Sequence, residues 1–205
     1  MNEFFFGLTT GMSLILAIGA QNLFVLEQGI KKNHIFLVTT ICALSDFLLI
    51  FLGIFLFYSI KSLLNEIFTL ALNLLLIIFL TFFIWGKIKT FKSPLQLSSG
   101  IVISKSTIIS QTLAFTFLNP HVYSDTVFIL GNLSKSLDTL SQKIIFGLGA
   151  STASLIFFYS IGYGAFFLRK YFLNKKVWNI TNLIIIFYLV GLVIYLFYFE
   201  IFESV

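Results

Sequence analysis

Long apolar stretches, separated by short charged segments, run along the whole chain. Six such stretches can be bounded by the charges between them, and each is long enough to cross a hydrocarbon core of about 30 Å as a helix. They cover about Phe4–Leu26, Ile35–Ile60, Ile67–Gly86, Ser106–Leu133, Ile144–Leu168 and Val177–Phe199. Helices are expected because lipid offers no partner for open backbone groups, and the chain lacks the short alternating strands of a barrel. The pattern predicts an all-α integral membrane protein with about six transmembrane helices.

Composition agrees with this pattern. Of the 205 residues, 59% are hydrophobic and 10% are charged, whereas an ordinary globular domain carries about 25% charged residues. Six spans leave no room for a soluble domain, and an N-terminus with Glu3 and no basic region does not predict a cleaved signal. The single cysteine, Cys42, cannot form an internal disulfide or a CxxC pair, which argues against a membrane thiol–disulfide carrier.

The loops divide the basic residues unequally between the two sides of the membrane. The larger group is Lys31, Lys32, Lys87, Lys89, Lys92, Lys105, Arg169, Lys170, Lys175 and Lys176, and the smaller is Lys61, Lys135 and Lys143. Cytoplasmic loops carry the excess of Lys and Arg, so the larger group is expected in the cytoplasm and both termini outside. These charges are expected to set topology rather than to bind nucleic acid. A five-span arrangement, with the first stretch re-entrant or on the surface, would spoil this division and stays an alternative.

Two aspartates lie inside apolar stretches, Asp46 near the middle of the second and Asp125 within the fourth. A central Asp costs roughly 2.5–3.5 kcal/mol on membrane insertion, and no Lys or Arg lies inside any stretch to offset that cost. Such a carboxyl group either takes up a proton or faces a watery cavity and binds an external cation. Both alternatives indicate transport. The remaining alternative is an Asp bonded to Ser, Thr or Tyr that only joins helices.

Helix-breaking residues interrupt the first and the fourth stretches. The first carries Gly19 within the segment AIGAQN, and the fourth carries Pro120 within the segment FLNPHVYSD. Pro120 cannot donate a backbone hydrogen bond, and its ring clashes with the carbonyl group of Thr116 in a continuous helix. Freed backbone groups at membrane depth require a cavity or polar partners. The partners available at the two breaks are Gln21, Asn22, Asn119 and His121.

The two breaks occupy corresponding places in two halves of three stretches each. Gly19-Ala20-Gln21 falls opposite Asn119-Pro120-His121, and Leu44-Ser45 with Gly53 resembles Ala153-Ser154 with Gly162. The second half must insert upside down relative to the first, because each half has an odd number of spans. Inverted repeats with broken helices that meet at the midplane are a recurring design of secondary transporters. We therefore expect one membrane domain with repeats at 1–92 and 106–205, joined by a basic cytoplasmic loop at 93–105.

At these residues the sequence resembles the LysE family of amino-acid exporters, in particular its lysine/arginine exporter branch. The matching segments are AIGAQNLFVLEQGI (Ala17–Ile30), CALSDFLLIFLGI (Cys42–Ile54) and FTFLNPHVYSDTVFILG (Phe115–Gly131), and the likeness extends over essentially the whole chain. Other branches usually show Asn-Pro followed by Lys, where this chain has His121. Relatives often have Pro at the first break, where this chain has Ala20, which predicts a less sharply broken first helix.

The resemblance implies export of lysine or arginine through the bacterial inner membrane, driven by the membrane potential or the proton gradient. The family's paired intramembrane aspartates correspond to Asp46 and Asp125, which are expected to bind the extra positive charge of the substrate. The α-carboxylate and α-amine are expected at the opened backbone of the breaks. The further candidates for substrate binding or transport are Gln21, Asn22, Ser45, Asn119, His121 and Tyr123, with Gly19 and Pro120 at the breaks. His121 is alternatively a proton relay, because imidazole titrates near neutrality.

Rival functions have less support in the sequence. A divalent-metal exporter would add more Asp, Glu, Cys or Met at bilayer depth than the pair Cys42 and Asp46 on one helical face. An enzyme would need a nucleophile–base pair or a metal cluster, and no HExxH or GxSxG segment occurs, so neither enzyme activity nor a cofactor is expected. Small residues at Gly147, Gly149, Ala150 and Ser151 predict a helix–helix face, either within the chain or between copies in a homo-oligomer.

Overall fold

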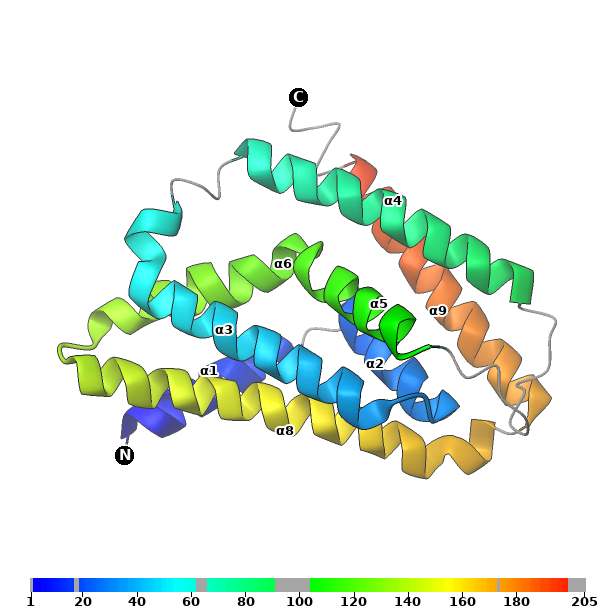
Figure 1. Cartoon of the computed structure of the whole chain (residues 1–205), viewed down its shortest axis with the longest axis horizontal. Helices are drawn as coiled ribbons and strands as arrows, with labels where there is room; N and C mark the ends of the chain where they lie inside the picture. The colour runs from blue at the N-terminus through cyan, green and yellow to red at the C-terminus, as the bar shows by residue number, and fades with distance from the viewer. Residues whose placement is uncertain (1, 17–18, 62–65, 91–103, 173, 199–205) are drawn as a thin grey trace.

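The computed structural model of the chain describes residues 2–16, 19–61, 66–90, 104–172 and 174–198. Every described element is helical, which confirms the all-α prediction (Figure 1). The elements are α1 (Asn2–Ile15), α2 (Ala20–Lys31), α3 (Ile35–Lys61), α4 (Glu66–Thr90), α5 (Lys105–Phe117), α6 (Pro120–Tyr123), a π-helical segment η1 (Ser124–Ile129), α7 (Leu130–Leu133), a 3-10 turn η2 (Ser134–Ser136), α8 (Leu140–Phe172) and α9 (Lys175–Tyr195).

Three described helices are long and apolar enough to cross a membrane by themselves. These spans are Ile35–Phe55, Leu140–Tyr171 and Lys176–Tyr198, and the bent pair α1–α2 is a fourth candidate. The three spans correspond to the second, fifth and sixth predicted stretches, and the bent pair α1–α2 corresponds to the first. Helix α4 occupies the third stretch, and the interrupted segment α5–α7 occupies the fourth. The chain is therefore a multi-pass membrane protein. A total of six spans, rather than five with a re-entrant first segment, stays a prediction.

The first predicted stretch, Phe4–Leu26, is two helices rather than one. Helix α1 ends at Ile15 and α2 begins at Ala20, with a bend of 85° between them. Gly19 precedes α2 in an extended conformation, with φ −119° and ψ 175°. The break is therefore present with Ala20 in the place where relatives often have Pro. That it is less sharp than in those relatives stays a prediction.

The fourth predicted stretch is interrupted at Pro120, as the sequence predicts. Helix α5 ends at Phe117 and α6 begins at Pro120. The side-chain oxygen of Asn119 accepts a hydrogen bond of 3.1 Å from the backbone N–H of His121, which caps the new helix. The following segment η1 is π-helical, and the backbone N–H of Leu130 donates to the carbonyl oxygen of Asp125. Such π-helical turns are uncommon and are frequent at functional sites.

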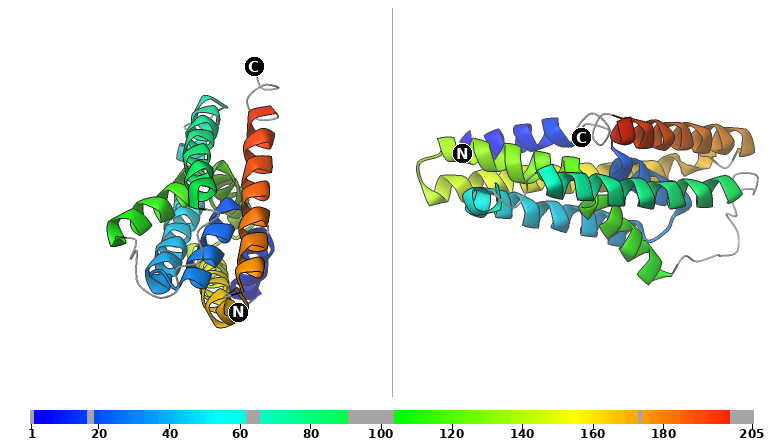
Figure 2. Two further views of the ribbon diagram at one scale, coloured as in Figure 1. Left: turned by 90° about the vertical axis from the view of Figure 1, so that its right-hand side faces the viewer. Right: turned by 90° about the horizontal axis from the view of Figure 1, so that it is seen from above.

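The two broken helices pack reciprocally across the molecule. Helices α1 and α2 pack on α8, whereas α5, η1 and α7 pack on α3; α3 also packs on α8, and α4 on α9 (Figures 1 and 2). Two glycines that the predicted repeat places opposite each other, Gly53 and Gly162, permit close approach. A Cβ at Gly53 of α3 would overlap the backbone of Val127, and a Cβ at Gly162 of α8 would overlap the side chain of Thr39. This reciprocity is what two repeats would produce, although the inverted repeat and its boundaries stay predictions and the loop at 93–105 lies mostly outside the described residues.

An aromatic cluster close to the two breaks packs α2 against α4 and α5. The rings of Phe24 and Phe115 stack with centroids 4.7 Å apart. The ring of Phe115 also meets Phe79 and Phe83 edge-on, at 4.9 Å and 5.0 Å. Phe24 and Phe115 are fully buried, so the helix segments on either side of the breaks have fixed positions from which to present polar residues.

The small-residue face of α8 packs within the chain. Gly149 lies against the backbone of Phe4 in α1, and Gly147 lies against Phe51 and Ile54 of α3. Of the two arrangements predicted for this face, the structure shows contact within one molecule.

We expect a Gly149→Ala substitution to destabilise the protein, because a Cβ there would overlap the carbonyl oxygen of Phe4 and force α1 away from α8. Overpacking of this kind costs about 1–3 kcal/mol. Gly164→Ala on the same helix is the matched control, since no described heavy atom lies within 4 Å of its added Cβ apart from the adjacent residues and backbone of its own helix. Thermal unfolding in detergent should show a lower midpoint for Gly149→Ala only. Equal midpoints for the two variants would contradict the α1–α8 contact.

Candidate functional site

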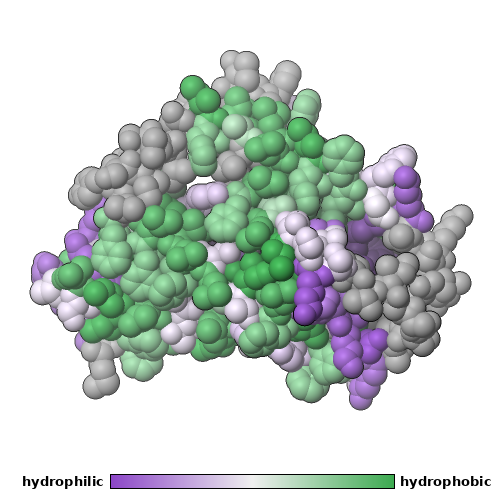
Figure 3. Space-filling model, in the orientation of Figure 1, coloured by the Kyte–Doolittle hydropathy of each residue, from purple (hydrophilic) through white to green (hydrophobic). Residues whose placement is uncertain are grey.

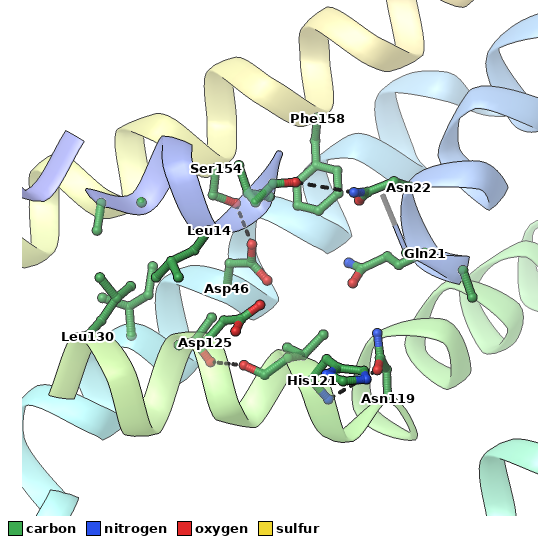
Figure 4. Close-up of a pocket in the computed structure, with 18 of the residues that line it drawn as sticks. Leu14, Gln21, Asn22, Asp46, Asn119, His121, Asp125, Leu130, Ser154 and Phe158 are labelled. Atoms are coloured by element: carbon green, nitrogen blue, oxygen red, sulfur yellow. Dashed lines mark hydrogen bonds between the residues drawn. The ribbon is translucent and has the colours of Figure 1, made fainter. Parts of the chain in front are cut away.

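A cavity of about 320 Å³ lies between the two helix breaks. This volume lies in the range of pockets that bind small molecules. Its walls come from α1, the start of α2, the middle of α3, the segment α6–α7 and α8 (Figure 4). Helix α9 adds Tyr188 and Leu192. The polar residues on the walls are Gln21, Asn22, Asp46, Asn119, His121, Asp125, Thr126, Ser154 and Tyr188, and Gly19 of the first break lies there with them. Segments distant in sequence thus bring most of the predicted site residues together.

The two aspartates face this cavity from different halves of the chain. Asp46 lies on α3 and Asp125 on the π-helical segment η1, and both line the cavity (Figure 4). Asp46 is 6% exposed, and the hydroxyl group of Ser154 donates a hydrogen bond of 2.7 Å to its Oδ2 atom. Asp125 is half-buried, with His121 as an electrostatic neighbour. None of the described lining residues is Lys or Arg.

The amide side chains at the breaks have different tasks. The Nδ2 atom of Asn22 donates a hydrogen bond of 3.3 Å to the carbonyl oxygen of Ile15, which joins α2 to the end of α1 across the bend. Asn119 caps α6, as described above. Gln21 is 5% exposed, and its Nε2 atom has no hydrogen-bond partner among the described residues. The amides of Asn22 and Asn119 therefore stabilise the two breaks, whereas the Nε2 atom of Gln21 is available to a ligand in the cavity.

Three predicted site residues do not line the cavity: Ser45, Tyr123 and Pro120, the last of which acts only as the helix-breaking residue at the start of α6. Ser45 is buried on α3 beside Asp46 but is not part of the cavity wall. The hydroxyl group of Tyr123 donates a hydrogen bond of 2.9 Å to the carbonyl oxygen of Phe117. This bond satisfies a backbone acceptor that the break at Pro120 releases from the α5 ladder. Tyr123 is thus placed to support the break rather than to meet a ligand in the cavity.

Sequence reasoning missed Ser154, Thr126 and Tyr188 as wall residues. Ser154 entered only as the counterpart of Ser45 in the repeat, and that register was the one signal that could have found it. Tyr188 lies in an uncharged apolar stretch, where no pattern separates a cavity residue from a lipid-facing one. Among the residues that the structure describes, no group of three or more His, Cys, Asp or Glu side chains is arranged to hold a metal ion.

A buried ion cluster lies outside the cavity and connects three helices. Glu27 of α2 is 2% exposed, and its two carboxylate oxygens lie 2.5 Å from the Nζ atom of Lys31 and 2.7 Å from the Nζ atom of Lys87. Lys87, at the end of α4, also donates to the Oδ1 atom of Asn182 on α9, at 3.3 Å. The charge pattern predicts only a topological role for Lys31 and Lys87. In the structure they also hold α2 against α4 and α9.

Comparison with known proteins places this architecture in a family. The family described as "LysE type translocator" matches residues 12–199, which include all the polar residues of the cavity wall. The chain belongs to the LysE family. The resemblance noted in the sequence is thereby confirmed. No solved structure matches the chain.

Relatives within the LysE family cover most of the chain. An arginine exporter protein ArgO from Pectobacterium atrosepticum is 36% identical over 181 residues, which are 86% of this chain and 87% of that protein. The ArgO protein of Escherichia coli strain K12 is 36% identical over 186 residues, 89% of this chain and 87% of its own length. A putative amino-acid transporter, YggA from Aeromonas salmonicida, is 34% identical over 199 residues, 93% of each chain.

Proposed function

We propose that this LysE family member exports basic amino acids, arginine or lysine, from the cytoplasm across the bacterial cytoplasmic membrane. The observation that carries the proposal is the pair Asp46 and Asp125 on one cavity between two helix breaks. The names of the relatives, arginine exporters and a putative amino-acid transporter, support the same substrate class.

Charge favours a cationic substrate. Two carboxyl groups line a cavity in which no described wall residue is Lys or Arg, so a bound cation meets no repulsion from such a side chain. Opposite charges attract much more strongly in a partly dry site than in bulk water. The guanidinium group of arginine or the ammonium group of lysine supplies this charge. Its binding offsets the free-energy cost of holding a carboxylate at membrane depth.

Energetics then favour exchange with protons. Moving one positive charge out of a cell against an inside-negative potential costs about 2.3 kcal/mol per 100 mV. In the proposed cycle, substrate from the cytoplasm displaces protons from Asp46 and Asp125, the two halves rock, and protonation from outside releases the substrate. One proton per substrate makes the exchange electroneutral. Two protons, one for each carboxylate, would let the membrane potential contribute as well.

The two halves of this cycle are proposed to be the repeats at 1–92 and 106–205, linked by the basic loop at 93–105. Their reciprocal packing supports this division. The breaks near Gly19 and Asn119 and the π-helical segment η1 are the points at which a helix can bend without losing a regular hydrogen-bond ladder. A small change of angle there would open the cavity to one side of the membrane and close it to the other.

The distribution of charge supports a cytoplasmic position for one end of the molecule. Helices α2, α4 and α8 end, and α9 begins, at the same end of the bundle (Figure 1). Hydrophilic residues gather toward the two ends of the visible face, and apolar residues cover its middle (Figure 3). The end that carries Lys31, Lys87, Arg169 and Lys176 is proposed to face the cytoplasm, with both termini outside.

The substrate can be tested in bacterial cells that express the chain after preloading with labelled amino acids. We expect faster efflux of arginine, lysine or both than in cells without the chain, and unchanged efflux of leucine, which has no side-chain charge. Equal membrane levels of the protein are checked by immunoblotting. Efflux of both basic amino acids at the rate of the control cells would refute the proposed substrate class.

A further inference from the structure

The two helix N-termini at the cavity differ in one respect that bears on how a substrate is oriented. At the second break, Pro120 has no N–H group, and the N–H groups of His121 and Val122 both donate to Asn119, at 3.1 Å and 3.2 Å. That N-terminus is closed by its own capping residue. At the first break, Gly19 has no side chain to cap α2, and no other side-chain cap is present in the described part of the chain.

The open N-terminus of α2 lies on the cavity wall. Gly19, Ala20 and Gln21 all line the cavity, and the first intrahelical bond is donated only by Leu23, to Gly19, at 3.2 Å. The N–H groups at the start of a helix have no partner within it. Together with the helix dipole, equivalent to roughly half a positive charge, they form a site that favours an anion.

The side chain of Gln21 independently indicates that a ligand binds at this N-terminus. Its side chain is 95% buried, since 5% is exposed, and its Nε2 atom has no hydrogen-bond partner among the described residues. Within the part of the chain that the structure describes, the only hydrogen-bonding interaction of this side chain is with the Cys42 thiol, and a thiol sulfur is a weak acceptor that leaves the amide donor largely unsatisfied. Figure 4 shows the amide of Gln21 pointing from α2 into the cavity, toward Asp46. A buried donor without a partner is costly, and an oxygen of a ligand in the cavity would satisfy it.

We propose that the N-terminus of α2, with Gln21, is the subsite for the α-carboxylate of the substrate. The inference rests on the proposed function, and it makes the cavity complementary to a basic amino acid as a whole. Such a substrate has two cationic groups and one carboxylate. The cavity presents two carboxyl groups, from Asp46 and Asp125, and one open helix N-terminus. A diamine would leave the N-terminus and Gln21 unsatisfied, so the subsite selects amino acids against their decarboxylated products.

The test uses agmatine, which is arginine without its carboxylate. The purified full-length chain is reconstituted in liposomes that contain unlabelled arginine, and counterflow of labelled arginine is measured against external unlabelled arginine or agmatine. For the wild type, we expect arginine to compete about 10- to 100-fold better than agmatine, the worth of a hydrogen-bonded charge. Gln21→Leu should reduce that ratio about tenfold by weakening arginine alone.

Gln28→Leu is the matched control. Gln28 lies on the same helix, is as deeply buried as Gln21 and has an unpartnered Oε1 atom among the described residues, but it does not line the cavity. Its substitution should leave the ratio of arginine to agmatine unchanged.

Three results would overturn the inference, and they are distinguishable. If agmatine competes as well as arginine in the wild type while arginine counterflow is robust, the subsite is wrong and the proposed function stands. If Gln21→Leu weakens both competitors equally, Gln21 has a structural role only. If the wild type shows no arginine counterflow, the proposed function fails, and the subsite fails with it. Should Gln21→Leu not fold, the wild-type ratio alone decides.

Discussion

An Asp46→Asn variant is expected to fold, reach the membrane and lose arginine export. Asparagine keeps the shape of the side chain, and its oxygen can still accept the hydrogen bond from Ser154. The negative charge, however, is removed from the cavity wall. Loss of one partner in a buried charge pair costs about 2–5 kcal/mol, so export should fall at least about 30-fold. The rate of labelled-arginine efflux per amount of protein in the membrane measures this fall.

Asp138→Asn is the matched control for this substitution. Asp138 is exposed between η2 and α8, so the same chemical change there should leave efflux unaltered. Asp125→Asn should behave like Asp46→Asn, because both carboxyl groups line the cavity. Normal efflux by both cavity variants would reduce the aspartates to helix-joining residues, which is the alternative that the sequence leaves open.

The second large effect is expected at the buried ion cluster. Glu27→Gln removes the charge that offsets Lys87, whose side chain is only 9% exposed. Breaking a buried ion pair by removing one partner costs about 3–5 kcal/mol. For a chain of this size, the midpoint of thermal unfolding should fall by about 6–20 °C. Intrinsic tryptophan fluorescence in detergent is a suitable measurement, because Trp178 is buried next to Lys31 of the cluster.

A double variant separates loss of charge balance from loss of contacts. Glu27→Leu combined with Lys87→Leu removes both buried charges, and such replacements are often neutral or stabilising. Lys31, with its side chain 32% exposed, can extend its ammonium group toward water. The double variant should therefore recover most of the stability that Glu27→Gln loses. Glu3→Gln, at the partly exposed start of α1, is the control for the Glu→Gln change, because Glu3 lies outside the buried cluster. If Glu27→Gln melts like the wild type, the cluster contributes nothing to stability.

The sequence predicts the helical framework well because lipid imposes one simple rule. A span must be a continuous apolar run, and charges mark its ends. The second stretch, predicted at Ile35–Ile60, is α3 at Ile35–Lys61, and the fifth, predicted at Ile144–Leu168, lies within α8 at Leu140–Phe172. The breaks were also found, because Gly19 and Pro120 act locally on the backbone. The angle of 85° between α1 and α2 was not predicted, because the sequence pattern marks where a helix ends but not the direction of the next helix.

Contacts between distant segments were the least predictable. Glu27 and Lys31 are one helical turn apart and could be paired from the sequence, but the approach of Lys87 depends on how α4 packs on α2 and α9. Ser154 reaches Asp46 only because α8 packs on α3. Conversely, Ser45 and Tyr123 are neighbours of cavity residues in sequence, yet helical rotation points them elsewhere. Polarity at membrane depth identified the cavity, and packing decided which polar residues line it.

We propose that this chain by itself moves basic amino acids through the cavity between its helix breaks. The most direct measurement is efflux of labelled arginine from liposomes that contain only the purified chain, with an acidic solution outside. We predict faster release than from liposomes that contain the Asp46→Asn, Asp125→Asn double variant at the same protein density. Release of arginine at one rate from wild-type, variant and protein-free liposomes, with the same result for labelled lysine, would contradict this proposal.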